Sequence, residues 1–139
     1  MQTFRVVKEP HGWAVRLGPG MCTPFWSKAL ALREAERLCR ALRAHGLRLA
    51  VVSNWDVGLH EHLAALGVGG LVDAVVTSAE AGAPKPAPAV WRIALARLGA
   101  EPEETVHVGD SDADAEGARA AGVRFEPAPL DRAAARILA

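Results

Sequence analysis

The sequence predicts an α/β fold, a three-layer Rossmann-like parallel sheet that follows an amino-terminal β-hairpin. From residue 47 onward, short runs rich in β-branched residues alternate with segments whose apolar residues recur at helical spacing. Glycines such as Gly46 and Gly67 follow the helical patterns, where they favour helix ends. With 139 residues, half of them hydrophobic, the chain can bury the core of one ordinary domain.

The first part of the chain predicts a hairpin and then a helix. Residues 4–18, "FRVVKEPHGWAVRLG", alternate apolar and polar side chains on either side of a turn that contains Pro10 and Gly12. Residues 27–46 have the spacing of an amphipathic helix. The Gly- and Pro-rich stretch between them is the candidate seam. We therefore divide the chain into a β-hairpin segment, residues 1–24, and an α/β core, residues 25–139.

The core follows the order β-α-β-α-β-α-β, which is typical of a parallel sheet with helices on both faces. The expected strands are residues 47–54, 71–78, 105–110 and 123–127, and the expected helices are residues 59–67, 113–122 and 130–139. Residues 82–100 are expected to start as a proline-stiffened loop and to continue as a further helix. In such sheets, chemistry takes place at the carboxyl ends of the strands. This rule selects Ser53 with Asn54, the proline-flanked loop of Lys85, and Asp110 with its acidic neighbours.

Composition excludes several classes of partner and site. Sixteen basic residues balance sixteen acidic ones, so nothing in the net charge favours nucleic acid or an anionic membrane. Cys22 and Cys39 are far apart and do not form a CxxC pair, which disfavours zinc and a disulfide scaffold. The first residues lack an apolar run of signal-peptide length. We expect a cytoplasmic protein.

Three segments in order, "VVSN", "KP" and "VHVGDSDAD", resemble the second, third and fourth motifs of the haloacid dehalogenase-like (HAD) hydrolase superfamily. Each segment is weak evidence alone, but the ordered set, with each member at a strand end, is specific. The similarity to the phosphatase-like branch extends over about residues 29–127. It implies an incomplete HAD-like core with a phosphomonoester hydrolase-type site for phosphate or a small phosphorylated molecule.

The resemblance also assigns roles to individual residues. The Ser53 hydroxyl and the backbone N–H of Asn54 would hold phosphoryl oxygens, and Lys85, the one catalytic residue assigned, would neutralise the phosphoryl charge. Asp110 would be the first ligand of a Mg²⁺ ion and Asp114 the second, because this hard cation takes one or two protein carboxylates. Magnesium is thus the implied cofactor.

Other polar residues have simpler explanations. Asp112 and Glu116 fit acidic residues at the start of the following helix, where negative charge is favourable. His60 and His62 flank Glu61 as in a metal cluster, but residues two apart on a helix do not share a face. We therefore expect surface histidines.

One feature of the family is missing. Its members begin with a strand that ends in DxD, whose first aspartate is the nucleophile, and this chain has no aspartate before Asp56. That strand occupies the centre of the family's sheet. Either a strand of the amino-terminal hairpin fills the position, or the hairpin belongs to a small fused module and a partner chain, such as a second copy in a homo-oligomer, completes the sheet.

These observations leave several functions open. The favoured one is a HAD-family protein with a phosphate and Mg²⁺ site but no identifiable aspartate nucleophile, inactive when alone. An active phosphatase would need a nucleophile from elsewhere. The alternatives are a non-catalytic binding or regulatory module, an interaction module, and a truncated gene product.

Overall fold

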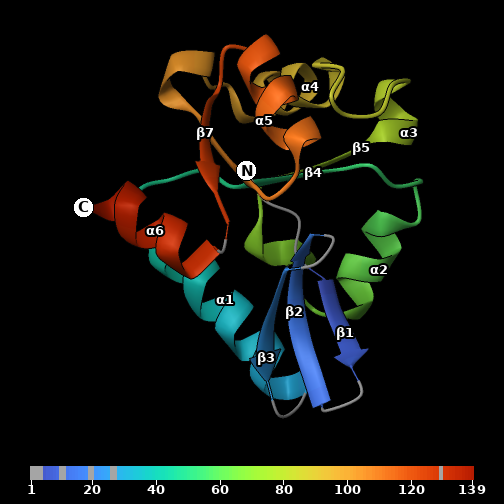
Figure 1. Cartoon of the computed structure of the whole chain (residues 1–139), viewed down its shortest axis with the longest axis vertical. Coiled ribbons are helices and arrows are strands. Elements are labelled where there is room, and N and C mark those ends of the chain that lie inside the picture. Colours follow the sequence, from blue (N-terminus) through green and yellow to red (C-terminus); the bar gives the residue numbers. More distant parts are fainter. Residues whose placement is uncertain (1–4, 10–11, 19–20, 26–27, 129) are drawn as a thin grey trace.

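Helices cover both faces of the parallel strands in the part of the chain that follows residue 47 (Figure 1). The computed structural model describes residues 5–9, 12–18, 21–25, 28–128 and 130–139, with side chains from residue 32 onward except at residue 129. The strands of the core are β4 (Ala50–Ser53), β5 (Ala74–Thr77), β6 (Val106–Gly109) and β7 (Arg124–Pro127). Its helices are α1 (Lys28–Ala44), α2 (Leu59–Ala65), α3 (Ser78–Ala81), α4 (Ala89–Leu98), α5 (Asp112–Ala120) and α6 (Leu130–Leu138), with 3-10 turns η1 (Gly69–Leu71) and η2 (Pro102–Glu104). The predicted α/β class is confirmed.

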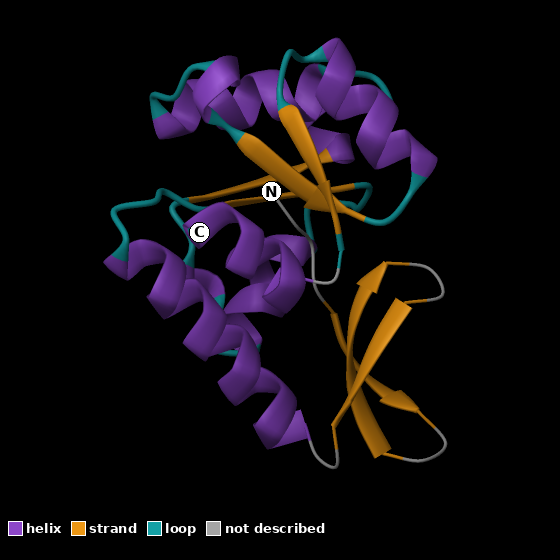
Figure 2. Cartoon of the chain, turned by 60° about the vertical axis from the view of Figure 1, so that its left-hand side comes forward, coloured by secondary structure: helices purple, strands orange, loops and turns teal. Residues whose placement is uncertain are grey.

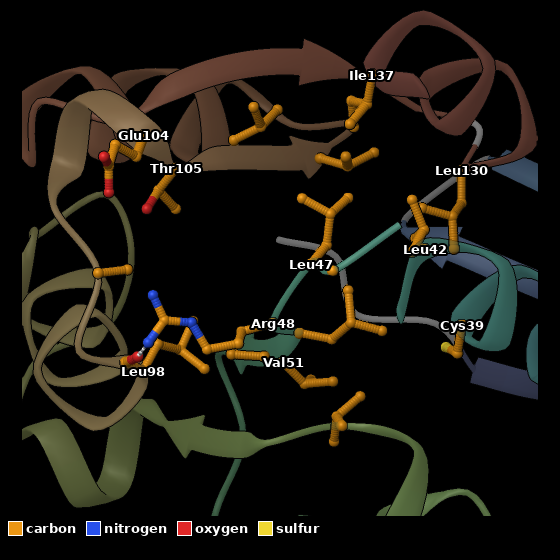
Figure 3. A pocket seen from close by; sticks show the side chains of 17 residues that line it. Cys39, Leu42, Leu47, Arg48, Val51, Leu98, Glu104, Thr105, Leu130 and Ile137 are labelled. Atoms are coloured by element: carbon orange, nitrogen blue, oxygen red, sulfur yellow. Dashed lines mark hydrogen bonds between the residues drawn. The ribbon is translucent and has the colours of Figure 1, made fainter. Parts of the chain in front are cut away.

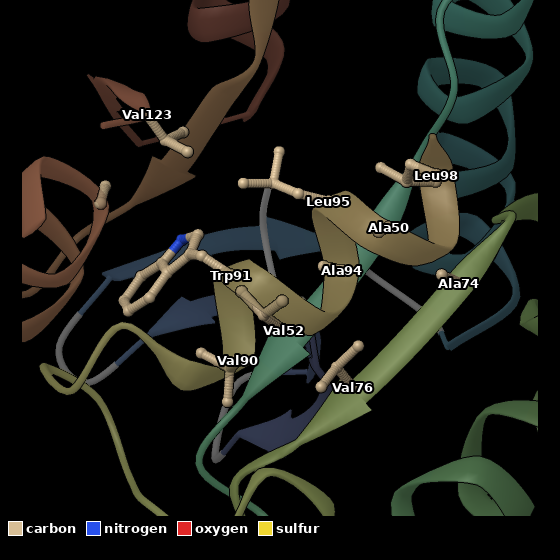
Figure 4. Packing of buried hydrophobic residues seen from close by; sticks show 11 residues of the cluster. Ala50, Val52, Ala74, Val76, Val90, Trp91, Ala94, Leu95, Leu98 and Val123 are labelled. Atoms are coloured by element: carbon tan, nitrogen blue, oxygen red, sulfur yellow. The ribbon is translucent and has the colours of Figure 1, made fainter. Parts of the chain in front are cut away.

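The alternation of side chains along β4 produces the layers. Ala50 and Val52 point to one face, where they pack with residues of β5 against α4 (Figure 4). Val51 points to the other face and joins a second cluster with residues of α1 and α2. Since both faces are covered, the strand is apolar throughout, as is typical of parallel sheets.

The parallel strands form two separate pairs. β4 pairs with β5 from Ala50 opposite Ala74 to Ser53 opposite Thr77, and β6 pairs with β7. No ladder joins β4 to β6 among the described strands. The central strand that the resemblance implies between β4 and β6 is not among the described strands.

A cavity of about 240 Å³ lies where residues of β4 and β6 approach one another (Figure 3). Its walls are mostly apolar and come from α1, from β6, from α6 and from the segment that precedes β4. Arg48 and Glu104 are charged residues of the lining. Arg48 is held by a hydrogen bond from its guanidinium to the backbone oxygen of Leu98. The core is therefore less completely filled here than around α4.

The amino-terminal strands form a sheet of their own. β1 (Arg5–Glu9), β2 (Gly12–Gly18) and β3 (Met21–Phe25) are antiparallel in the order β1-β2-β3, and they lie against α1 (Figure 2). β3 was not expected, because residues 18–24 are rich in glycine and proline and form the predicted seam. Proline is compatible with an edge strand, where its missing N–H can face away from the ladder.

The arrangement of this sheet bears on the missing central strand. In the described part of the chain, the three strands pair with each other and not with β4 or β6. A hairpin strand inserted between β4 and β6 does not match this pairing. The division at residues 24 and 25 and the completion of the sheet by a partner or a homo-oligomer stay predictions.

Two general expectations concern redox state and membranes. Cys39 is a free, buried cysteine, and burial raises the pKa of its thiol, so it packs as a small apolar side chain. The side chain of Cys22 lies outside the described residues.

None of the described helices is long and apolar enough to cross a membrane. The cytoplasmic location stays a prediction.

Candidate phosphate and metal site

The residue after β4 fixes the loop that carries Lys85. The Asn54 side-chain oxygen accepts a hydrogen bond from the backbone N–H of Lys85 at 2.7 Å, and its Nδ2 donates to the Lys85 carbonyl at 3.4 Å. Pro84 and Pro86 restrict the backbone on both sides of the lysine. The second and third motifs are thus joined by the Asn54 side chain, a role that the sequence had not indicated.

The Lys85 side chain connects this loop to the segment after β6. Its ammonium lies 2.6 Å from Oδ1 of Asp114, near the start of α5. Both side chains are largely buried, with exposed fractions of 12% and 7%. The carboxyl ends of β4 and β6 therefore meet at one site, as the parallel arrangement predicts.

Asp114 is the centre of a hydrogen-bond network. Besides Lys85, its Oδ1 lies 2.9 Å from Nε2 of His107, and its Oδ2 accepts the Ser111 hydroxyl at 2.7 Å. The N–H groups of Asp110 and Ser111 also approach Oδ2, at 3.4 and 3.3 Å. Burial alone would raise the pKa of Asp114, but hydrogen bonds from His107, Lys85 and Ser111 hold it well below its usual range.

This network gives Asp114 a role within the protein. Both oxygens of its carboxylate already accept hydrogen bonds, and through one of them it pairs with Lys85 and orients its ammonium. Its assignment as a second Mg²⁺ ligand stays a prediction.

Asp110, the first residue after β6, has a different environment. Its Oδ2 is buried and has no hydrogen-bond partner among the described residues. Burial, followed by the nearby charge of Asp114, raises the pKa of Asp110. A buried carboxylate oxygen without a donor is costly by itself and is satisfied by a cation. Asp110 is therefore suited to be one protein ligand of a Mg²⁺ ion, whose other ligands would be water and phosphate oxygens.

The described side chains do not form a preformed cage that would supply the remaining ligands. In the part of the chain whose side chains are described, no three His, Cys, Asp or Glu residues gather as a metal site. A Mg²⁺ ion here would therefore depend on oxygens from water, phosphate or another segment.

Ser53 lies at the same end of the sheet. It is buried as the last residue of β4, opposite Thr77 of β5, and its carbonyl accepts the backbone N–H of Trp55 at 3.0 Å. This location agrees with the sequence expectation, while contact of its hydroxyl with a phosphoryl oxygen stays a prediction.

Sequence reasoning missed two members of the network. Ser111 is the N-cap of α5 and forms a capping box with Asp114, so the S-x-x-D spacing was the available signal. His107 gave no signal, since one histidine within a short apolar strand is usually a packed core residue. Asp112 and Glu116 are exposed at the start of α5 and further along it, in agreement with the helix interpretation.

His60 and His62 have separate neighbours, as expected for surface histidines. His60 Nε2 lies 2.6 Å from Oε1 of Glu80, and the His62 ring stacks on Trp55 with ring centroids 5.8 Å apart. The two rings therefore do not face one site.

Parallel strands between helices, with a lysine and two aspartates close to their carboxyl ends, define an α/β protein with charged groups gathered at one edge of its sheet. Comparison with known proteins agrees. A family model described as haloacid dehalogenase-like hydrolase matches residues 21–122. The chain belongs to the haloacid dehalogenase-like hydrolase family.

Individual relatives support the assignment. Haloacid dehalogenase-like hydrolase domain-containing protein 3 of Mus musculus is 38% identical over 130 residues, which are 88% of this chain and 51% of that protein. Ribulose-1,5-bisphosphate 5-phosphatase of Halopiger xanaduensis is 33% identical over 121 residues, 84% of this chain and 51% of that protein. The chain thus spans about half the length of these curated relatives.

The fold is also found among solved structures. The crystal structure of a HAD phosphatase from Thermococcus onnurineus superimposes with a TM-score of 0.61 at 32% sequence identity. The match covers 64% of this chain and 42% of that one. The comparison confirms a partial HAD-type fold.

Proposed function

We propose that the chain binds a phosphoryl group and a Mg²⁺ ion at the carboxyl ends of β4 and β6, in the manner of a phosphomonoester hydrolase. One observation carries this proposal: the Lys85 ammonium is bonded to Asp114 next to Asp110, whose buried oxygen lacks a donor among the described residues. A fixed cation beside a carboxylate suited to a metal ion is the arrangement that a phosphate dianion requires.

Each group would act on a different part of the ligand. The hydroxyl of Ser53 and the N–H of Asn54 would donate to phosphoryl oxygens, while Lys85 would neutralise their charge. Lys85 cannot swing freely, because Asn54 holds its backbone and Asp114 its ammonium. Preorganisation of this kind lowers the reorganisation needed when charge develops on the phosphoryl oxygens.

Asp110 would hold the Mg²⁺ ion. When bound, the ion would supply charge neutralisation at the phosphoryl oxygens. Asp110 can bind the ion only when its carboxylate is ionised, and its pKa is raised in the absence of the ion. The affinity for Mg²⁺ should therefore increase with pH across the titration of this group.

Hydrolysis by the usual covalent route would need a carboxylate nucleophile opposite Asp110. The chain has no aspartate before Asp56, and Asp56 itself is exposed in the loop after β4, where it accepts the N–H of Gly58 at 2.8 Å. We therefore propose that the chain is inactive alone and that hydrolysis requires a carboxylate from another segment or partner.

The names of relatives indicate the class of ligand. The Halopiger xanaduensis relative is named for hydrolysis of a phosphorylated sugar. On this basis we propose a small phosphorylated molecule, with no nucleic acid or membrane as partner. A cytoplasmic location agrees with such a ligand.

Isothermal titration calorimetry tests the binding site. Inorganic phosphate with Mg²⁺ should bind the wild-type chain, and Asp110→Asn should weaken binding about tenfold or more, because an ionised ligand is lost. Asp112→Asn is the matched control: its exposed side chain lies two residues away, and binding should change less than twofold. Absence of phosphate binding by the wild type would reject the proposal.

Turnover of an aryl phosphate separates the alternatives. A chain without a nucleophile should show no hydrolysis above the buffer rate. Turnover that disappears in both Asp110→Asn and Lys85→Ala would instead favour an active phosphatase with an unexpected nucleophile. Neither binding nor turnover would favour an interaction module or a truncated product.

A further inference from the structure

A buried histidine contacts the network behind the proposed phosphate site, although nothing in the motifs assigns it a role. His107 lies in the middle of β6, with an exposed fraction of 1%. Its Nε2 is 2.9 Å from Oδ1 of Asp114, the same oxygen that accepts the Lys85 ammonium at 2.6 Å. The two donors therefore converge on one acceptor atom.

The hydrogen-bond partner identifies the tautomer. Oδ1 of Asp114 accepts the Lys85 ammonium and lies 2.9 Å from Nε2 of His107, so the histidine donates from Nε2–H to this oxygen. Nδ1 then carries the lone pair, and it is buried without a partner among the described residues. A histidine in this state donates one hydrogen bond, in the direction of Asp114.

The ring is held from behind by an aromatic contact. The Trp91 ring, fully buried on α4, meets the His107 ring edge-on, with centroids 5.1 Å apart. Trp91 is in turn packed against α5, since a Cβ at Gly117 would overlap its ring. Figure 4 shows the Trp91 ring extending from α4 away from Val76 and Ala74. The imidazole therefore contacts the Trp91 ring of the core on one side and the Asp114 carboxylate on the other.

From this geometry we propose that His107 is a positioning residue for phosphate binding: through its Nε2–H bond it fixes the Asp114 carboxylate, which in turn holds the Lys85 ammonium at the site. The proposal rests on the phosphate site proposed above. Ser111 fixes the second oxygen of the same carboxylate from the opposite side of the group. With His107 on Oδ1 and Ser111 on Oδ2, the Asp114 carboxylate cannot rotate away without breaking a buried hydrogen bond.

Two variants separate the hydrogen bond from packing. His107→Gln retains an amide N–H at a reach close to that of Nε2–H, whereas His107→Met has a similar length and no donor. Both lose the aromatic contact with Trp91. A difference in Lys85 order or in phosphate affinity between the two variants therefore reports the effect of the N–H donor, provided that circular dichroism shows both to be folded. His62→Gln, on the exposed face of α2, is the control for histidine loss.

The first measurement follows Lys85 directly. The chain contains three lysines, Lys8, Lys28 and Lys85, so the NMR signals of the lysine ε-methylene groups can be assigned with Lys8→Arg and Lys28→Arg variants. The Lys85 order parameter should be high in the wild type, in His107→Gln and in His62→Gln. It should fall clearly in His107→Met.

The second measurement is phosphate affinity by calorimetry. The dissociation constant should rise about fivefold or more in His107→Met, in line with one lost hydrogen bond, and less than twofold in His107→Gln. Equal losses of Lys85 order in both variants, or none in His107→Met, would overturn the proposal. If the wild type fails to bind phosphate, the functional site is rejected, while the NMR comparison still decides whether His107 fixes Lys85 through Asp114.

Discussion

Among single residues, Lys85 and Asp114 form an ion pair that is far less exposed than the pairs on the surface of α1. Both members are largely buried, and Asp114 has two further donors. Loss of one member of such a pair leaves an uncompensated buried charge. The pair should therefore contribute to folding as well as to the phosphate binding proposed above.

Replacement of the lysine should reveal this cost. Lys85→Met retains the length of the side chain and removes its charge, and we expect the free energy of unfolding to fall by about 3 kcal/mol in urea denaturation. Arg40→Met is the control, because Arg40 pairs with Glu36 on the exposed face of α1 and should contribute about 0.5 kcal/mol or less. Equal effects would show that the buried pair is dispensable.

The buried histidine predicts a dependence of stability on pH. Burial lowers the pKa of His107 to about 3, below its ordinary value of 6.5. Below pH 6.5 the unfolded chain therefore binds a proton that the folded chain does not. Stability should decrease as the pH falls from 6.5 toward 3, by at most about 1.4 kcal/mol per pH unit from this group.

Thermal or urea unfolding in metal-free buffer between pH 4 and 8 measures this slope. His107→Gln should have a clearly flatter profile above pH 4, while His62→Gln should keep the wild-type slope. A wild-type profile that is flat from pH 6.5 to 4 would contradict the burial of a neutral histidine.

At the scale of secondary-structure elements, the contact between α4 and α5 depends on a glycine. A Cβ at Gly117 of α5 would overlap the Trp91 ring of α4 and lie 2.8 Å from the backbone oxygen of Pro86. The close approach brings α5, with Ser111 and Asp114 at its start, toward the loop of Lys85. Packing of the two helices therefore positions the site.

Gly117→Ala should separate these helices. Overpacking costs about 1–3 kcal/mol or more and exceeds the gain of about 1 kcal/mol from alanine in a helix, so we expect a net loss near 2 kcal/mol, measured by urea unfolding. Gly70→Ala is the matched control, because an added Cβ there has no neighbour within 4 Å and should cost less than 0.5 kcal/mol. A stable Gly117→Ala chain would show that Trp91 can move.

At the scale of the whole molecule, the core is filled unevenly. One cluster joins β4 and β5 to α4, and a second joins β4 to α1 and α2. Beside them lies the cavity of about 240 Å³ between residues of β4 and β6 (Figure 3). Side chains on its wall lack part of the contacts that a packed core supplies.

A comparison of two leucines tests this difference. Leu59 is 1% exposed within the second cluster, whereas Leu42 is 6% exposed and lines the cavity. Leu59→Ala should destabilise by about 4 kcal/mol and Leu42→Ala by about 2 kcal/mol, because the leucine in the closely packed site loses more contacts. Differential scanning calorimetry measures both. A larger loss for Leu42→Ala would indicate that the cavity wall is tightly packed.

The α/β class, the order of the core elements and the edge of the sheet that carries the candidate site can be predicted from the sequence. Periodicity of 2 and 3.6 residues and glycines at helix ends are local signals, and the carboxyl ends of parallel strands must share an edge. Ser53, Lys85 and Asp110 follow from that rule together with the family motifs.

Tertiary structure alone decided how the site is held. The bonds of Asn54 to Lys85, of Lys85 to Asp114 and of His107 to Asp114 join residues whose contact depends on the packing of β4, β6 and α5. The separation of β4 from β6 is also non-local. A single sequence records which groups are available, but not which of them share one buried oxygen, because that depends on distances set by the whole core.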